Sequence, residues 1–178
     1  MSGPDLTSLL SLRDWRALGE ETGVRSELQE GVRIVTPRPA KRHIRAVHRL
    51  WNALESAAGE DYEVLGEIDI VIDDHTPATV RVPDLVVCAA TAPDNLDAAH
   101  VLLAVEVISP GTRRIDRVMK RSEYADAGIA HYWIIDLDGP RLTELALIDG
   151  EYTGREHIGE FTTAAPFTFQ VNLHTLTG

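Results

Sequence analysis

The segments RVPDLVVC (residues 81–88) and LLAVEVISP (residues 102–110) each place a single acid in an apolar run. The valine-rich runs have the length and composition of buried strands. Their acids are Asp84 and Glu106. A carboxylate that is buried without a partner costs several kcal/mol, so such an acid usually binds a cation, pairs with a base or lines a cleft. Asp84 and Glu106 are therefore the first candidates for functional residues.

Length and composition are those of an ordinary globular protein. The chain has 178 residues, of which 44% are hydrophobic and 25% charged, which suffices for a core without disulfides. We therefore expect one domain over residues 1–178. There is no long uncharged apolar run, the N-terminus MSGPDLTSLLSLRDW is a poor signal peptide, and Cys88 is the one cysteine. The simplest expected location is the cytoplasm.

Charge is distributed unevenly along the chain. The net charge of −11, taken alone, argues against a nucleic-acid partner. Residues 31–54 and 113–121, however, hold 11 of the 17 basic residues and one of the 28 acids. A basic face on an acidic body can guide a polyanion to one surface and repel it elsewhere. The alternative is that both segments are ordinary solvent-exposed helix faces.

The pattern of apolar residues predicts an α/β chain. An amphipathic helix is expected over residues 40–58, where apolar side chains follow the 3.6-residue period, and a second helix over residues 113–127, which Gly128 ends. The remaining expected elements are a short helix over 14–22, a hairpin over 26–36 that turns at Gly31, strands over 62–73, 79–88, 101–109 and 132–136, and short strands over 141–171.

Strand and helix geometry can bring four of the polar residues together. Side chains alternate between the faces of a strand, so Asp84 and Glu106 can share one divalent ion if their strands are neighbours. Mg²⁺ prefers oxygen ligands, often one or two carboxylates with water and phosphate. Asp116 and Lys120 are four residues apart and lie on one side of the expected helix. Lys120 could then orient an attacking water or stabilise charge on a phosphate, while the metal activates the water.

The combined motifs resemble a known family. PD (83–84), EVISP (106–110), D-x3-K-x3-Y (116–124), AG (127–128) and HYWIID (131–136) look like the Uma-type restriction endonucleases of the PD-(D/E)XK nuclease superfamily. E-x2-E-G (27–31) and P-x5-H (37–43) are similar to that family too. The resemblance covers residues 25–137, with the tail as additional strands.

The resemblance implies a restriction-endonuclease-like core of the α/β (α+β) class. This core is a mixed central sheet flanked by helices, in αβββαβ order, with an extra N-terminal hairpin and C-terminal strands. Asp84 and Glu106 are then the metal carboxylates. One position departs from the superfamily, because Ile108 stands where its lysine normally follows the acid. The resemblance suggests that Lys120 has taken over the catalytic role of that lysine.

Further residues are candidates for the same site. Glu27 is either a third acid near the metal or an exposed hairpin residue. His43, at the start of the long helix, either reaches a phosphate or water at the site or is exposed. Asp116 is expected to orient Lys120 rather than bind the metal. The basic residues expected to contact nucleic acid are Lys41, Arg42, Arg45, Arg49, Arg113, Arg114 and Arg117.

Three functions are compatible with these residues. The first is an endonuclease that uses Mg²⁺ or Mn²⁺ to hydrolyse DNA, most simply double-stranded DNA; a homodimer would supply the two active sites that cutting both strands commonly requires. The second is a nuclease-fold module that has lost catalysis and binds DNA or a protein. The third is an enzyme acting on a small phosphorylated molecule. The two lone acids argue against the second function, and the many basic residues argue against the third.

Overall fold

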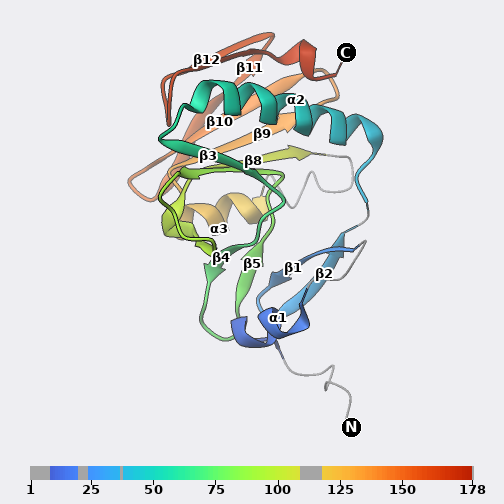
Figure 1. Cartoon of the computed structure of the whole chain (residues 1–178), viewed down its shortest axis with the longest axis vertical. Coiled ribbons are helices and arrows are strands. Elements are labelled where there is room, and N and C mark those ends of the chain that lie inside the picture. The colour runs from blue at the N-terminus through green and yellow to red at the C-terminus, as the bar shows by residue number, and fades with distance from the viewer. Residues whose placement is uncertain (1–8, 20–23, 37, 109–117, 178) are drawn as a thin grey trace.

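The computed structural model describes residues 9–19, 24–36, 38–108 and 118–177. Its larger sheet has six strands in the order β11-β10-β9-β8-β6-β3 (Figure 1). β8 and β9 run parallel, whereas the other neighbours are antiparallel, so the sheet is mixed. The strands are β3 (Tyr62–Gly66), β6 (Leu85–Ala89), β8 (Val101–Ile108), β9 (His131–Asp136), β10 (Arg141–Ile148) and β11 (Glu151–Ile158).

Two helices, α2 (Lys41–Ala58) and α3 (Lys120–Asp126), cover opposite faces of this sheet (Figure 1). The alternation of side chains along β8 explains the arrangement: Val105 packs in the cluster with Leu50 of α2, and Ile108 packs in the cluster with Tyr124 of α3. Glu106 shares the face of Ile108, so its carboxylate lies on the side of α3.

A smaller sheet lies at the other end of the molecule, with the order β2-β1-β5-β4-β7 (Figure 1). Its β1–β2 hairpin turns at Gly31, whose φ of 76° favours glycine, and a Cβ there would lie 2.7 Å from Leu9 Cβ. The helix α1 packs on this sheet through Trp15, which contacts the cluster of Leu28, Ala78 and Val80. The elements are α1 (Leu12–Leu18), β1 (Arg25–Gln29), β2 (Val32–Thr36), β4 (Ile70–Asp73), β5 (Thr79–Arg81) and β7 (Leu96–Asp97).

Two of the expected strands are each divided between the two sheets, so those predictions are wrong. Residues 62–73 form β3 and β4, because Glu67 takes a left-handed φ of 52° that interrupts the extended backbone. Residues 79–88 form β5 and β6, with Pro83 between them. Proline has no N–H to donate to a neighbouring strand. The chain therefore crosses from one sheet to the other beside Asp84.

The other expected elements differ mainly at their ends. The short helix begins at Leu12, because Ser11 caps it by accepting the Asp14 N–H. The segment between β6 and β8 contains β7 and the 3₁₀ turn η1 (Ala98–His100). The second helix ends as α3 at Asp126, and residues 113–117 of its expected N-terminal part lie outside the described residues.

The C-terminal part adds β10 and β11 to the large sheet and then forms β12 (Glu160–Thr163), β13 (Phe169–Asn172) and η3 (Leu173–Leu176). The mixed α+β architecture and the αβββαβ order of α2, β3, β6, β8, α3 and β9 confirm the predicted fold class. Among the helices that the structure describes, none is long and apolar enough to cross a membrane.

Candidate functional site

Asp84 lies one residue before β6, at the junction of the two sheets. The pairing of β6 with β8 begins at Leu85 and Val105. Continued by one residue, this antiparallel register sets Asp84 opposite Glu106, where side chains share a face. Both carboxylates are buried, each residue being 3% exposed. The two acids singled out in the sequence therefore lie side by side, Glu106 within β8 and Asp84 directly before its neighbour β6.

Three donors hold the Asp84 carboxylate. The Val107 backbone N–H donates to Oδ2 (2.7 Å), while Arg25 Nη1 (2.9 Å) and His43 Nε2 (3.2 Å) bond to Oδ1. Burial alone would raise the pKa of Asp84, but the His43 hydrogen bond and the charge of Arg25 outweigh it and hold the pKa below its usual value. Asp84 is therefore an ionised group with a fixed orientation.

Lys120 is buried between two acids. Its Nζ donates to Glu27 Oε1 (2.9 Å) and to Glu106 Oε1 (2.7 Å), and the residue is only 4% exposed. The Tyr124 hydroxyl, one helical turn further along α3, lies 3.4 Å from the same Glu106 oxygen. An ammonium that bridges two carboxylates in this way is fixed in place and has its charge balanced.

A second buried cation, Arg81, fixes the other side of Glu27. Arg81 Nη1 donates to Glu27 Oε2 (3.0 Å), and its Nε and Nη2 form a bidentate pair with Glu123 (2.7 Å each). The Val82 backbone N–H also donates to Glu27. Burial would raise the pKa of Glu27, but the charge and hydrogen bond of Lys120, with Arg81, lower it below its usual value. Glu27 thus connects the lysine on α3 to the small sheet.

The donor set of this cluster fits a hard divalent cation, because Asp84, Glu106 and Glu27 supply carboxylate oxygens. A different group, Asp73, Asp74 and His75, has ligand atoms within 4.8 Å of one another in the described part of the chain. That group is exposed at the end of β4, with the His75 side chain 89% exposed. Exposed acids often cluster without binding an ion, so we place the candidate metal site at the buried carboxylates.

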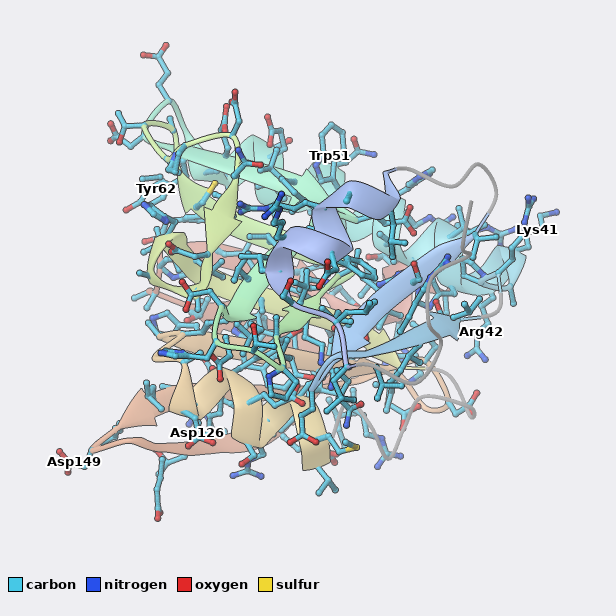
Figure 2. The ribbon with its side chains drawn as sticks, turned by 90° about the horizontal axis from the view of Figure 1, so that it is seen from below. Lys41, Arg42, Trp51, Tyr62, Asp126 and Asp149 are labelled. Atoms are coloured by element: carbon cyan, nitrogen blue, oxygen red, sulfur yellow. The ribbon has the colours of Figure 1, made fainter. Side chains whose placement is uncertain are left out.

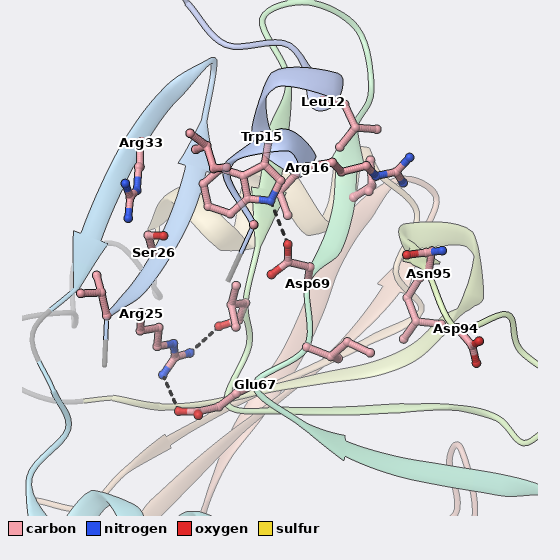
Figure 3. A pocket seen from close by; sticks show the side chains of 18 residues that line it. Leu12, Trp15, Arg16, Arg25, Ser26, Arg33, Glu67, Asp69, Asp94 and Asn95 are labelled. Atoms are coloured by element: carbon pink, nitrogen blue, oxygen red, sulfur yellow. Dashed lines mark hydrogen bonds and ion pairs between the residues drawn. The ribbon is translucent and has the colours of Figure 1, made fainter. Parts of the chain in front are cut away.

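A groove of about 600 Å³ lies between α1, the β1–β2 hairpin and β4 (Figure 3). Its lining includes Trp15, Arg16, Arg25 and Arg33, together with acids such as Glu67. Figure 3 shows the Arg25 side chain extended toward Glu67 at one end of the groove. Because Arg25 also bonds to Asp84, its guanidinium joins the groove to the buried acids.

A family model described as "Uma2: Putative restriction endonuclease" matches residues 10–174. The chain belongs to the Uma2 family. Its structure is similar to the crystal structure of "a putative nuclease belonging to DUF820 from Anabaena variabilis", with a TM-score of 0.74 at 18% sequence identity. The similarity covers 94% of this chain and 97% of that one, and shows that the fold is shared. Among curated proteins, none matches the chain significantly.

In this Uma2 chain the candidate residues fall into three groups: a largely buried cluster, residues outside the described part of the chain, and the basic residues of α2. Asp84, Glu106, Lys120, Glu27 and His43 come together in one buried cluster. Glu27 and His43 therefore contact the cluster instead of being exposed. Four expected residues, Asp116, Arg113, Arg114 and Arg117, lie outside the described residues.

The basic residues of α2 are exposed, but two of them also hold the helix in place. Arg42 pairs with Asp138 (2.8 Å) and donates to the Leu137 carbonyl, while Arg49 donates to the Thr175 carbonyl (2.7 Å). Figure 2 shows Lys41 and Arg42 pointing outward at the start of α2. Arg45 is exposed on the same helix.

The sequence analysis missed three residues that belong to the same buried network, namely Arg25, Arg81 and Glu123. A signal for two of them was present: Arg25 lies two residues before Glu27 in β1, hence on the same strand face, and Glu123 follows Lys120 by three residues on α3. No local pattern marks Arg81 as a partner of Glu27, because that contact joins residues 54 positions apart.

Proposed function

We propose that this chain is an endonuclease that requires a divalent metal and hydrolyses phosphodiester bonds of DNA. The observation that carries the proposal is the buried Lys120 ammonium, fixed between Glu27 and Glu106 on the face of the sheet that also holds Asp84. Lysine is almost never buried this deeply unless it is paired, and ionisable groups that are buried beside a specific charge partner cluster at functional sites. The Uma2 family is described as a restriction endonuclease family, and the similar crystal structure is described as that of a nuclease.

Each residue of the cluster has a distinct part in this proposal. Asp84 and Glu106 would hold Mg²⁺ or Mn²⁺, which when bound polarises a phosphoryl oxygen and activates water. Lys120 would stabilise the negative charge that develops on the phosphate, or orient the attacking water. Glu27 positions the Lys120 ammonium, and Arg81 in turn positions Glu27. His43 holds the Asp84 carboxylate in its orientation.

Exposed cations on α2 support a nucleic-acid substrate. Lys41 and Arg45 are exposed on this otherwise acidic chain, whose net charge is −11. Phosphate contacts supply most of the non-specific affinity for DNA, and a local basic surface directs the polyanion to one side of the protein. A small phosphorylated substrate would not need cations along a whole helix.

The test is nicking of supercoiled plasmid DNA with Mg²⁺, with Mn²⁺ and with a chelator. We expect metal-dependent cleavage by the wild type and a loss of about 100-fold or more in Asp84→Asn, Glu106→Gln and Lys120→Met, a range typical for removal of a group that stabilises a transition state. Glu151→Gln, at the exposed start of β11, is the matched acid-to-amide control and should cut like the wild type. Circular dichroism checks that each variant is folded.

Two outcomes would contradict the proposal. Equal cleavage by the wild type and the Asp84 and Glu106 variants would assign the activity to other residues or to a contaminant. DNA binding by the wild type without cleavage in either metal would favour a nuclease-fold binding module instead.

A further inference from the structure

Arg25 bonds to the Asp84 carboxylate and also lines the groove. Its side chain crosses from β1 of the small sheet to the start of β6 in the large sheet, where Nη1 donates to Asp84 Oδ1 (2.9 Å) and Nη2 to the Val82 carbonyl. The side chain is 21% exposed, whereas that of Asp84 is 4% exposed. Arg25 therefore lies at the boundary between the buried acids and the groove.

One oxygen of the Asp84 carboxylate, Oδ1, already has two hydrogen-bond donors. A carboxylate oxygen offers two lone-pair directions. Those of Oδ1, the oxygen bound by the groove-lining Arg25, are taken by Arg25 and His43, whereas Oδ2 accepts one described donor, the backbone N–H of Val107. A cation that binds through Oδ1 must displace one of these donors. The two candidates for displacement are therefore Arg25 and His43.

Arg25 is the donor best able to leave. It already has a second acid within reach, because Nη1 lies 3.7 Å from Glu67 Oε1, and the Glu67 side chain is 61% exposed at the edge of the groove. A divalent cation at Asp84 would also repel the guanidinium. A planar guanidinium released toward a groove can bind a phosphate with two parallel hydrogen bonds.

We propose that Arg25 is a substrate-positioning residue that exchanges partners: it holds Asp84 when no metal is bound, and it binds a phosphate of the nucleic acid when a divalent metal takes its place. This inference rests on the proposed function, since it needs the metal at Asp84. In this proposal one strand of the nucleic acid lies in the groove between α1 and the β1–β2 hairpin, next to the metal. It also explains how the buried acids remain neutralised before the metal arrives.

The experiment separates metal binding from catalysis. Mn²⁺ affinity is measured by calorimetry for the wild type, Arg25→Gln, Arg25→Lys and Arg16→Gln, and affinity for a short DNA duplex is measured in Ca²⁺ at several salt concentrations. Arg16 is exposed in the same groove but has no described contact with Asp84, so Arg16→Gln controls for the loss of one charge.

We expect Arg25→Gln to bind Mn²⁺ at least about fivefold more tightly, since its competitor is gone, and to lose DNA affinity with a salt slope smaller by about one phosphate contact. Arg16→Gln should leave Mn²⁺ affinity unchanged. Arg25→Lys keeps the positive charge but lacks the planar guanidinium that can donate two parallel hydrogen bonds. This variant should therefore bind Mn²⁺ like the wild type and bind DNA less tightly. It also tests the proposal if Arg25→Gln does not fold.

Weaker Mn²⁺ binding in Arg25→Gln, or an unchanged DNA salt slope in both Arg25 variants, would overturn the exchange and leave Arg25 as a structural ion-pair partner. That result would not affect the proposed nuclease if the wild type still cleaves plasmid. Conversely, a wild type that binds Mn²⁺ and DNA through this exchange but never cleaves would overturn the nuclease proposal alone.

Discussion

Arg81 is the residue whose replacement should destabilise this protein most clearly through electrostatics. It is fully buried, forms a bidentate pair with Glu123 at 2.7 Å, and bonds to Glu27 at 3.0 Å. Arg81→Met keeps much of the side-chain volume but leaves Glu27 with one cation fewer. Removing one partner of a buried ion pair costs about 3–5 kcal/mol, because the remaining charge stays buried.

The magnitude can be measured by urea and thermal unfolding. In a chain of 178 residues, each kcal/mol corresponds to about 2–4 °C in Tm, so Arg81→Met should lower the Tm by at least about 6 °C. Arg141→Met is the matched control: the Arg141 pair with Glu156 is long, at 3.5 Å, and its side chains are 39% and 40% exposed. Exposed pairs contribute about 0–1 kcal/mol.

A double-mutant cycle distinguishes the ion pair from lost packing. The double variant Arg81→Met, Glu123→Leu should lose less unfolding free energy than the two single variants together, by at least about 1 kcal/mol. The reason is that Glu123→Leu removes an acid that has already lost its partner. Loss of less than about 1 kcal/mol in Arg81→Met, or additive single effects, would refute the argument that this network is held by its charges.

Three further predictions concern the same cluster and the sheet that supports it. The pKa values of Glu27 and Asp84 are lowered by folding from 4.5 and 3.8, so their contribution to stability is present above those values and is lost as the pH falls through the lower pKa values of the folded state. The urea midpoint should therefore fall steeply below about pH 4.5, and less steeply in Glu27→Gln, while an unchanged profile in that variant would contradict the assignment. Mg²⁺ or Mn²⁺ should stabilise the wild type by about 2.7 kcal/mol at 100 times the dissociation constant, seen as a rise in Tm that a chelator reverses. An equal rise in Asp84→Asn would show that the ion binds at another site. A Cβ on Gly154 of β11 would lie 1.7 Å from the Glu144 carbonyl oxygen, so Gly154→Ala should cost about 1–3 kcal/mol or more in thermal unfolding, whereas a silent substitution would mean that the β10–β11 pairing adjusts freely.

Local patterns in the sequence predicted the elements that depend on neighbouring residues. The amphipathic period over residues 40–58 corresponds to α2, and the hairpin at Gly31 corresponds to β1 and β2. The strands around residues 62–73 and 79–88 were predicted as continuous because their apolar runs continue past Glu67 and Pro83. Whether such a run stays in one sheet depends on partner strands, which are distant in sequence.

The candidate site divides in the same way. Asp84, Glu106 and Lys120 could be singled out because two acids interrupt apolar runs and the lysine has a fixed helical spacing. Glu27 and His43 remained open between two interpretations, since neither lies in a pattern that demands burial. Arg25 was missed altogether, because an arginine at the start of a strand is usually exposed.

Local sequence patterns were enough to identify the two apolar runs with their acids, the order of helices and strands in the core, and the family resemblance. The partners that neutralise those acids become visible only in the folded chain. The contact of Glu27 with Lys120 spans 93 residues, and that of Arg25 with Asp84 spans 59. Hydrophobic periodicity acts within one element, whereas a buried charge is satisfied by whichever opposite charge the folded chain brings to it.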